Sequence, residues 1–519
     1  MKNRIKQYLL AASMCVGLTA CSDFFEPIPG VQFGLDETFA SKQRTEEYLN
    51  NVYSYVREVT DAIHPNTYGG IFTEASLDGA NRWNKTYAEW TNGSFNSASA
   101  QASEYFSKYY QAIAKASTFI QNVDKCTEAA ASTRGKWKSE ARALRAYYYF
   151  ELLRLYGPIP LIGEDPIPLD ASLEELIKER NSVDECVNFI ATELQSAIDS
   201  GDLLQRAGKA NLGRMDVATC MALKAKLYLY WASPLFNGNT DQASVKNKDG
   251  KQLFPQTEDN SKWAQARDAY ERFMTFATGQ GYKLTEVYTN GKLDPYASCR
   301  AAGEFFTTTW EAVDELIFVK LRDLYDYTYW VCPKFTDFQD TDVTGGGGYY
   351  TTQETVDLFF TKDGLTIEED PGYDKFEGIP GANNFTSGRY YDPNNPSRLY
   401  FDADKSKVLK QWKDREPRFY VNITYSGSIW LNEGKYNEEM RFTNGANGTC
   451  GKSKASGDCP DSGYLIRRGA KSSNNNGSKH FSPVLRLADM YLGYAEALCM
   501  CSDLDNALTY LNKIRVRAG

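Results

Sequence analysis

Apolar residues recur at helical spacing through the first half of the chain and again at its end, with a long irregular stretch between. The periodic stretches of the first half cover residues 36–59, 103–123, 136–156, 182–200, 214–232 and 261–278. Apolar positions repeating at i, i+3 and i+4 form one face of an α-helix, and Gly157-Pro158 is a helix stop after the third stretch. No strand pattern of similar strength separates these segments. The first half therefore predicts a run of helix pairs.

The final stretch, residues 485–519, predicts two more helices joined by a short turn. The first helix has one apolar face, made of Leu487, Tyr491, Tyr494 and Leu498. Ser502, followed three residues later by Asp505, predicts the N-cap of the second helix. The apolar face of that helix is made of Leu504, Leu508, Leu511 and Ile514. Such a pair has the form of one solenoid unit, whose apolar face needs a neighbour to cover it. A generic helical hairpin is the alternative.

Between residues 281 and 480 helical periodicity fades, and Gly, Asn, Asp, Ser and Tyr become frequent. Residues 315–321 alternate like a short strand, residues 353–361 predict a short helix, and residues 345–348 are four glycines. Long irregular insertions lie on a surface and usually carry function. The predicted fold is mostly α, a tetratricopeptide-like scaffold of helical pairs with a loop-rich inserted subdomain. We place its regions at 21–280 and 281–519, after a targeting segment at 1–20.

The first twenty residues have the pattern of a bacterial targeting segment. Lys2, Arg4 and Lys6 precede an apolar run over residues 8–18, which is too short to span a bilayer comfortably. Residues 18–21, Leu-Thr-Ala-Cys, match the lipobox of bacterial lipoproteins, in which the chain is cut before the cysteine and the thiol is lipidated. The prediction is a signal peptide over 1–20 and a lipid anchor at Cys21. The alternative is an ordinary secretory signal in which Cys21 is incidental.

Composition narrows the class of ligand. Removal of residues 1–20 takes away three basic and no acidic residues, leaving 55 basic and 67 acidic residues and a net charge of −12. Phosphate binding relies on basic patches, so nucleic acid is not expected as a partner. The aromatic fraction is 14%, with 35 tyrosines, whose amphipathic rings suit both core edges and wet binding surfaces. These features are compatible with a protein that binds a neutral ligand such as a glycan.

The eleven cysteines do not form a disulfide framework. Five of them lie in helical patterns and are expected to be small buried side chains: Cys126, Cys186, Cys220, Cys499 and Cys501. Cys450 and Cys459 flank a Gly/Ser/Lys stretch, where an exported protein has either a loop disulfide or two thiols. No CxxC pair or His/Cys cluster indicates zinc. We predict no cofactor and no metal.

The chain lacks the residue constellation that an enzyme needs. The two histidines, His64 and His480, lie in unrelated loops, and no GxSxG, P-loop or HExxH motif is present. Glu74 and Asp78 could act as a glycosidase pair. With 67 acidic residues in the chain, however, a pair of this kind is expected by chance. The prediction is binding without catalysis, with a surface glycosidase as the alternative.

Several blocks of the chain resemble one family in both sequence and order. RLADMYLGYAEAL followed by LNKIRVRAG is similar to the C-terminal signature of the SusD/RagB family of outer-membrane, glycan-capturing lipoproteins. ARALRAYYYFELLRLYGPIPLI is a close match to the family's helix-then-Gly-x-x-Pro block. Further matches occur in the family's order: FTEASLDG, YYQAIAKASTFIQNVD, LYLYWASPLFNGN, TTQETVDLFFTKDGL, DREPRFYVNI and SGYLIRRGAK. One departure is that the chain stops at Arg517-Ala518-Gly519, where relatives continue.

The resemblance implies a location, a function and a partner. A protein of this family is anchored by lipid to the outer membrane and faces the cell exterior. It is expected to capture oligosaccharides for polysaccharide utilisation and to hand them to a TonB-dependent SusC-like transporter, over which it sits as a hinged lid. The helical face would carry the transporter contact, and the loops would carry the ligand. A lid of the same kind of complex that takes peptides is the alternative.

Three clusters of loop aromatics are the candidate ligand-binding residues, because a sugar packs its C–H face on a flat ring while its hydroxyls bond to nearby polar groups. The clusters are Asn81-Arg82-Trp83-Asn84, then Tyr325, Tyr327, Tyr329 and Trp330, then Tyr349-Tyr350, with Trp430 as an outlier. The resemblance points first to Trp83 and Trp330, with Arg82 and Asn84 as polar partners. Tyr329 and Tyr350 complete the predicted site. The alternative is that these rings fill small cores under loops, as Trp137, Trp231 and Trp263 are expected to do within helices.

Overall fold

The computed structural model describes residues 34–57, 76, 79–81, 93–165, 167–168, 171–303, 314–322, 331–334, 345–376, 378, 380–430, 459–468, 470 and 480–519. The α-helices of this part are α2 (Leu35–Ala40), α3 (Lys42–Ser54), α6 (Ala100–Asn122), α7 (Ala131–Tyr156), α8 (Leu173–Leu176), α9 (Val183–Asp199), α10 (Val217–Ala232), α11 (Ser261–Gly279), α12 (Pro295–Gly303), α14 (Gln353–Asp357), α15 (Pro417–Asn422), α16 (Leu487–Met500) and α17 (Leu504–Ala518). The strands are β1 (Ala80–Asn81), β2 (Tyr288–Thr289), β3 (Lys292–Leu293), β4 (Leu316–Arg322), β5 (Tyr349–Tyr350), β6 (Arg389–Asp392), β7 (Asn395–Asp402), β8 (Ile423–Tyr425), β9 (Tyr464–Ile466) and β10 (His480–Arg486).

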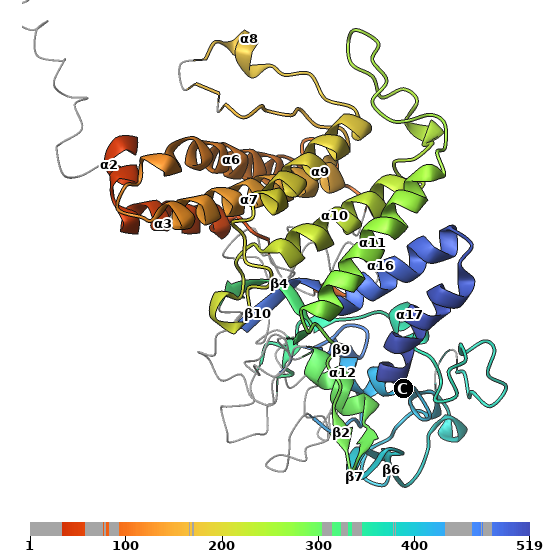
Figure 1. Cartoon of the computed structure of the whole chain (residues 1–519). Coiled ribbons are helices and arrows are strands. Elements are labelled where there is room, and N and C mark those ends of the chain that lie inside the picture. The colour runs from red at the N-terminus through yellow and green to blue at the C-terminus, as the bar shows by residue number, and fades with distance from the viewer. Residues whose placement is uncertain are drawn as a thin grey trace, which may run out of the picture.

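The long helices lie side by side in a row that follows the chain, as Figure 1 shows. Each packs against the next: α6 on α7, α7 on α9, α9 on α10, α10 on α11 and α11 on α16. The helical-pair scaffold predicted from the periodicity is confirmed. Local signals fix several of its ends. Ser182 and Glu185 form the capping box that begins α9, and Gly157, at φ +69°, ends α7 in a backbone conformation that favours glycine.

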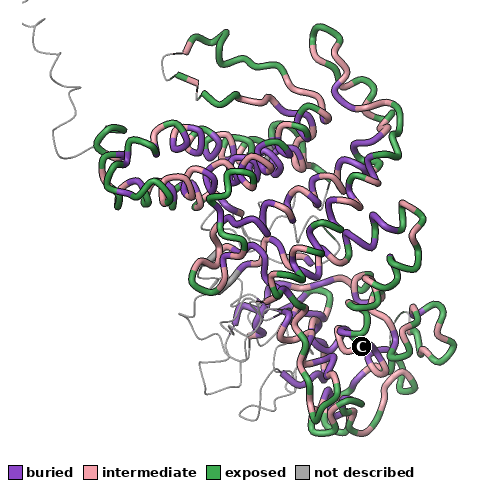
Figure 2. Tube along the Cα trace, viewed as in Figure 1, coloured by how far each residue is buried: buried purple, intermediate pink, exposed green. Residues whose placement is uncertain are grey.

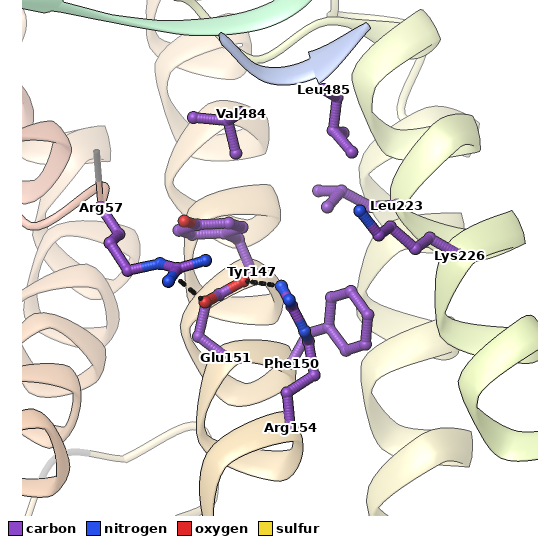
Figure 3. Close-up of a pocket in the computed structure, with 9 residues that line it drawn as sticks. All are labelled: Arg57, Tyr147, Phe150, Glu151, Arg154, Leu223, Lys226, Val484 and Leu485. Carbon is purple, nitrogen blue, oxygen red and sulfur yellow. Dashed lines mark hydrogen bonds and ion pairs between the residues drawn. The ribbon is translucent and has the colours of Figure 1, made fainter. Parts of the chain in front are cut away.

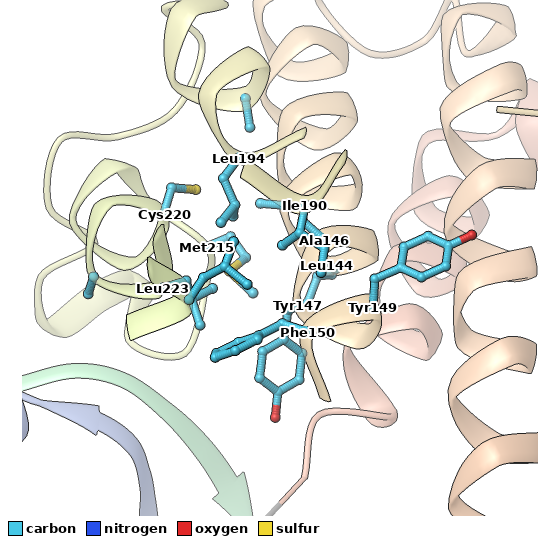
Figure 4. Packing of buried hydrophobic residues seen from close by; sticks show 14 of the residues in the cluster. Leu144, Ala146, Tyr147, Tyr149, Phe150, Ile190, Leu194, Met215, Cys220 and Leu223 are labelled. Atoms are coloured by element: carbon cyan, nitrogen blue, oxygen red, sulfur yellow. The ribbon is translucent and has the colours of Figure 1, made fainter. Parts of the chain in front are cut away.

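The core of this scaffold is continuous from α3 to α16, because each helix buries the side that faces its neighbours (Figure 2). Figure 4 shows where α7, α9 and α10 meet, with Ile190, Leu194 and Leu223 packed against residues of α7. Trp137, Trp231 and Trp263 are all buried, as predicted for tryptophans within helices. Among the residues described above, no helix combines the length and apolar character needed to cross a bilayer.

One buried ion pair crosses this core. Arg145 on α7 is completely buried and donates from Nε to Glu193 Oε2 on α9 at 2.9 Å, and from a terminal nitrogen to Ser117 Oγ on α6 at 3.0 Å. Glu193 is itself 5% exposed. A buried charge is tolerated when it is paired and hydrogen-bonded. The guanidinium therefore joins three successive helices at one point.

The insertion joins the scaffold through a two-stranded sheet, in which β4 pairs antiparallel with β10. The strand predicted over residues 315–321 is therefore confirmed as β4, and the short helix predicted from residue 353 is α14. Glu315, fully buried before β4, accepts from a terminal nitrogen of Arg517 on α17 at 2.8 and 2.9 Å. His480 begins β10, so it belongs to a strand and not to the loop that was expected.

The closing pair, α16 and α17, returns to the scaffold, and α16 packs on α11 (Figure 1). Two details of the prediction are wrong. Ser502 adopts φ +64° in the turn, and Asp503 caps α17 instead, accepting from the Asn506 N–H. Leu504 and Leu508, predicted on the apolar face of α17, are 57% and 50% exposed. The side of α17 that packs on α16 instead carries Ala507 and the Tyr510 ring.

The cysteine predictions divide in the same way. Cys126, Cys186 and Cys220 are buried in the scaffold, as expected. Cys499 is exposed and Cys501 is half-buried, because both lie where α16 ends, beyond its packed turns. The pairing of Cys450 with Cys459 stays a prediction, since Cys450 lies outside the described residues.

Candidate ligand-binding site

A four-stranded sheet in the order β1-β5-β9-β8 brings together segments that are far apart in the sequence. Ala80 pairs with Tyr350 and Asn81 pairs with Tyr349, both in antiparallel register, and Tyr350 pairs with Leu465 on its other side. β1 and β8 are the edge strands of this sheet. The first predicted cluster begins at Asn81, so its first residue lies directly beside the third cluster, Tyr349-Tyr350.

The glycine run at residues 345–348, just before β5, contacts the backbone of residues 332–333. All four glycines are buried, and Gly347 has φ +58°. The Gly345 N–H donates to the Pro333 carbonyl at 3.1 Å, and the Gly347 N–H donates to the Cys332 carbonyl at 2.8 Å. Glycine permits such a close approach of two backbones because it has no Cβ. The segment 331–333 therefore runs alongside the glycine run that leads into β5.

These contacts bring the attachment points of the predicted clusters to one place. In the antiparallel register of β1 and β5, the chain leaves Asn81 in the direction of Gly348. Val331, the residue after the second cluster, belongs to the segment that lies along the same glycines. Arg82, Trp83, Asn84, Tyr329 and Trp330 themselves lie outside the described residues, so their role as ligand-binding residues stays a prediction.

Two of the predicted rings can be located directly. Tyr350 is half-buried in the middle of the sheet, where its role as a ligand-binding residue is still a prediction. Its neighbour Tyr349 is 1% exposed. Trp430, the predicted outlier, is also 1% exposed, and the Arg467 guanidinium lies 5.8 Å from its ring centroid. Tyr349 and Trp430 therefore have no exposed ring face, and for these two the alternative of a filled loop core is correct.

An aromatic core supports the sheet from within the insertion. The Tyr400 and Tyr420 rings stack with centroids 3.9 Å apart and planes 9° from parallel. Trp412 Nε1 donates to the Tyr464 hydroxyl at 3.0 Å, and that hydroxyl donates to Gln353 Oε1 at 2.8 Å. Burial raises the pKa of Tyr464 to about 12, so the phenol stays protonated. Many tyrosines of the insertion are therefore structural, which the sequence composition alone did not reveal.

Metal-binding groups and acid–base groups differ in how far the described residues cover them. Within the described ranges, no group of three His, Cys, Asp or Glu side chains could hold a metal ion. His64, Glu74 and Asp78 lie outside those ranges. Glu74 and Asp78, the pair of the glycosidase alternative, are therefore tested by an activity assay and not by this structure.

Comparison with known proteins identifies the class. Residues 315–519 match the model of a family described as the SusD family, and residues 32–229 match one described as starch-binding and associating with the outer membrane. Both matches agree with the helical-pair scaffold and its loop-rich insertion. The chain belongs to the SusD/RagB family.

Individual relatives agree with this assignment at the level of the fold. A SusD-like protein from Bacteroides ovatus is 27% identical over 175 residues, which cover 32% of this chain and 30% of that relative. The chain thus aligns with less than a third of the curated relative's length. The solved structure named BT4246 has a TM-score of 0.74 at 24% identity and covers 92% of this chain and 82% of its own. A SusD-like carbohydrate-binding protein, BF0978 from Bacteroides fragilis, has a TM-score of 0.60 at 18% identity, over 90% of this chain and 75% of its own.

Proposed function

We propose that this protein is a surface-exposed lipoprotein of the outer membrane that binds oligosaccharides, without cleaving them, and delivers them to a SusC-like TonB-dependent transporter. The observation that carries the binding role is the common location of three attachment points at the glycine run. Asn81, two residues before Trp83, pairs with Tyr349, and Cys332, two residues after Trp330, accepts from the Gly347 N–H, while Tyr350 lies in the strand that follows the glycines. Family membership and a fold shared with a carbohydrate-binding protein support the same function.

The chemistry of the proposed site suits a neutral sugar. Trp83 and Trp330 would present flat rings to the C–H faces of the glycan, and Arg82 and Asn84 would bond to its hydroxyls. Tyr329 and Tyr350 would widen the platform. Ligand sites of this kind combine apolar surfaces with a few polar groups that fix orientation. Two rings presented side by side would lose less conformational entropy on binding than two rings on independent loops.

The test is a set of affinities for purified oligosaccharides. Trp83→Ala and Trp330→Ala should each weaken binding about tenfold or more, as loss of a buried aromatic anchor does. Tyr288→Ala is the matched control, because that ring is 60% exposed on the β2–β3 hairpin, which is not part of the four-stranded sheet. Unchanged affinity in both tryptophan variants would refute the placement of the site. Binding of peptides but no glycan would favour the peptide-lid alternative, and release of reducing ends would favour a glycosidase.

We place the transporter contact on the helical scaffold, supported by an apolar groove beside α6. The groove has a volume of about 440 Å³, and its walls include Phe106, Ile113 and Ile177. Leu173 and Ile177, on and just after α8, are 74% and 68% exposed. Exposed apolar patches of this kind mark protein-binding surfaces.

Co-purification with the transporter tests this placement. Ile177→Asp should lower the amount of transporter recovered, because burial of a charge in an apolar contact is costly. Leu504→Asp is the control, since Leu504 is 57% exposed on α17 instead. Equal recovery with both variants would remove the groove from the interface.

A further inference from the structure

A small charged cavity lies inside the helical scaffold, and none of its lining residues belongs to the four-stranded sheet or to the glycine run. It is lined by Arg57, three residues after the end of α3, and by residues of α7, α10 and β10, and its volume is about 70 Å³. Figure 3 shows Arg57, Glu151, Arg154 and Lys226 converging on it from three different segments. Leu223 and Leu485 form apolar walls. The cavity therefore combines several charges with a low-polarity lining.

Positive charge exceeds negative charge in this cavity. Among the described residues that line the cavity, Glu151 is the only one with a carboxylate, and it is 3% exposed. Its two oxygens are both engaged: Arg57 Nε lies 3.4 Å from Oε2, and a terminal nitrogen of Arg154 lies 2.8 Å from Oε1. Burial alone would raise the pKa of Glu151, but the nearby Arg154, Arg57 and Lys226 lower it, so the carboxylate is ionised. Three cations and one carboxylate leave two positive charges uncompensated.

Three donors of this cavity have no hydrogen-bond partner within the described structure, and one of them is the buried Tyr147 hydroxyl. The Arg154 Nε is buried and has no hydrogen-bond partner within the described structure. Lys226, half-buried on α10, makes no hydrogen bond or ion pair in that same part of the chain. The Arg154 guanidinium is held in place by aromatic faces, 5.1 Å from the Tyr230 centroid and 5.5 Å from the Phe150 centroid. Buried donors without partners are rare in folded proteins and point to a missing acceptor.

We propose that this cavity is a binding site for a small carboxylate, held by Lys226 and Arg154. One water needs roughly 10–15 Å³ of such volume, so about 70 Å³ is enough for a group of a few heavy atoms. A carboxylate accepts several charge-assisted hydrogen bonds at once and adds one of the two missing negative charges. Bound there, it would link Arg154 on α7 to Lys226 on α10. The source is either a free organic acid or the carboxylate of an acidic sugar.

The experiment uses the mature full-length protein in low-salt buffer and follows its thermal unfolding midpoint and its binding heat. The titrants are acetate, glucuronate, neutral glucose, and chloride at matched ionic strength. Acetate should bind and raise the midpoint, because a ligand that binds only the folded state stabilises it. Glucose and chloride should not. Binding of glucuronate as tightly as acetate would identify the sugar acid as a source, whereas weaker binding would identify free organic acids.

Two variants make the test specific. Lys226→Gln should weaken acetate binding about tenfold or more, as expected for loss of one charge-assisted hydrogen bond. It breaks no hydrogen bond or ion pair of the described structure, so the variant is expected to fold. Lys224→Gln, on the same helix, is the control, because the Lys224 ammonium instead donates to Gln195 Oε1 at 2.7 Å. An effect of acetate that survives in Lys226→Gln, or one that chloride reproduces, would overturn the proposal.

Discussion

Gly493 on α16 lies against Tyr270 on α11, and Gly493→Ala tests the packing of the closing helical pair on the scaffold. A Cβ at this position would lie 2.2 Å from the hydroxyl oxygen of Tyr270 on α11 and 2.7 Å from its Cζ. Both distances are far below van der Waals contact. Tyr270 is 1% exposed, and its ring stacks on Tyr494 with centroids 6.2 Å apart. The ring therefore cannot move aside without disturbing the α11–α16 interface.

The size of the effect follows from two opposing contributions. Forcing an extra methyl group into a packed core costs about 1–3 kcal/mol. Replacing glycine by alanine inside a helix gains up to about 1 kcal/mol from helix propensity. We therefore expect Gly493→Ala to lower the free energy of unfolding by about 1–2 kcal/mol. Gly279→Ala is the matched control, because Gly279 ends α11 and a Cβ there would meet no atom within 4 Å.

The assay is thermal and urea-induced unfolding of both variants beside the wild-type protein. Gly493→Ala should unfold at lower temperature and lower urea concentration, whereas Gly279→Ala should match or slightly exceed the wild type. Adding Tyr270→Phe to Gly493→Ala removes the nearest clashing atom and should recover part of the loss. A Gly493→Ala protein as stable as the Gly279→Ala protein would show that α16 does not pack on α11 at this distance.

Three further predictions concern burial, ionisation and export. Arg145→Met should lower the free energy of unfolding by about 3–5 kcal/mol, because it leaves Glu193 buried without its main partner. Lys138→Met, which breaks an exposed ion pair with Asp124, should change that free energy by less than about 1 kcal/mol. Equal effects of the two variants on urea unfolding would contradict this prediction. Burial raises the pKa of Asp216 to about 6, above the unfolded value of about 3.9, so ionisation should remove about 3 kcal/mol of stability as pH rises from about 4 to 6. Asp216→Asn should abolish that fall, and parallel stability–pH curves for the two proteins would argue against it. Cys21→Ala should leave the protein unlipidated and absent from the membrane fraction, and its retention there, measured by fractionation and mass spectrometry, would contradict the lipobox assignment.

The helical scaffold could be predicted because its signal is local. Apolar positions along the segments that became α6 and α9 repeat within each helix, so the period is visible without knowledge of any partner. Breaks within a segment were harder to see. The helix predicted over 36–59 is in fact divided at Ser41 and ends at Ser54. The prediction missed both points because neither interrupts the apolar spacing.

The sheet of the insertion could not be predicted, because its information is not local. β1 and β5 have two residues each, and their pairing joins positions 80–81 to 349–350. Two residues carry no measurable alternation, so only the folded chain shows that they are neighbours. The prediction of which single rings are exposed fails for a similar reason. Tyr349 and Trp430 stand in irregular stretches of the sequence, yet both are buried in the folded chain, Tyr349 in a strand paired with β1 and Trp430 beside Arg467.

Calorimetric titration of the mature protein with a panel of neutral oligosaccharides and size-matched peptides tests the proposed function most directly. We expect at least one oligosaccharide to bind the wild-type protein and Tyr288→Ala equally, and to bind the double variant Trp83→Ala/Trp330→Ala at least tenfold more weakly. Peptide binding without glycan binding, or equal affinity of the double variant for the glycan, would contradict glycan capture by these rings.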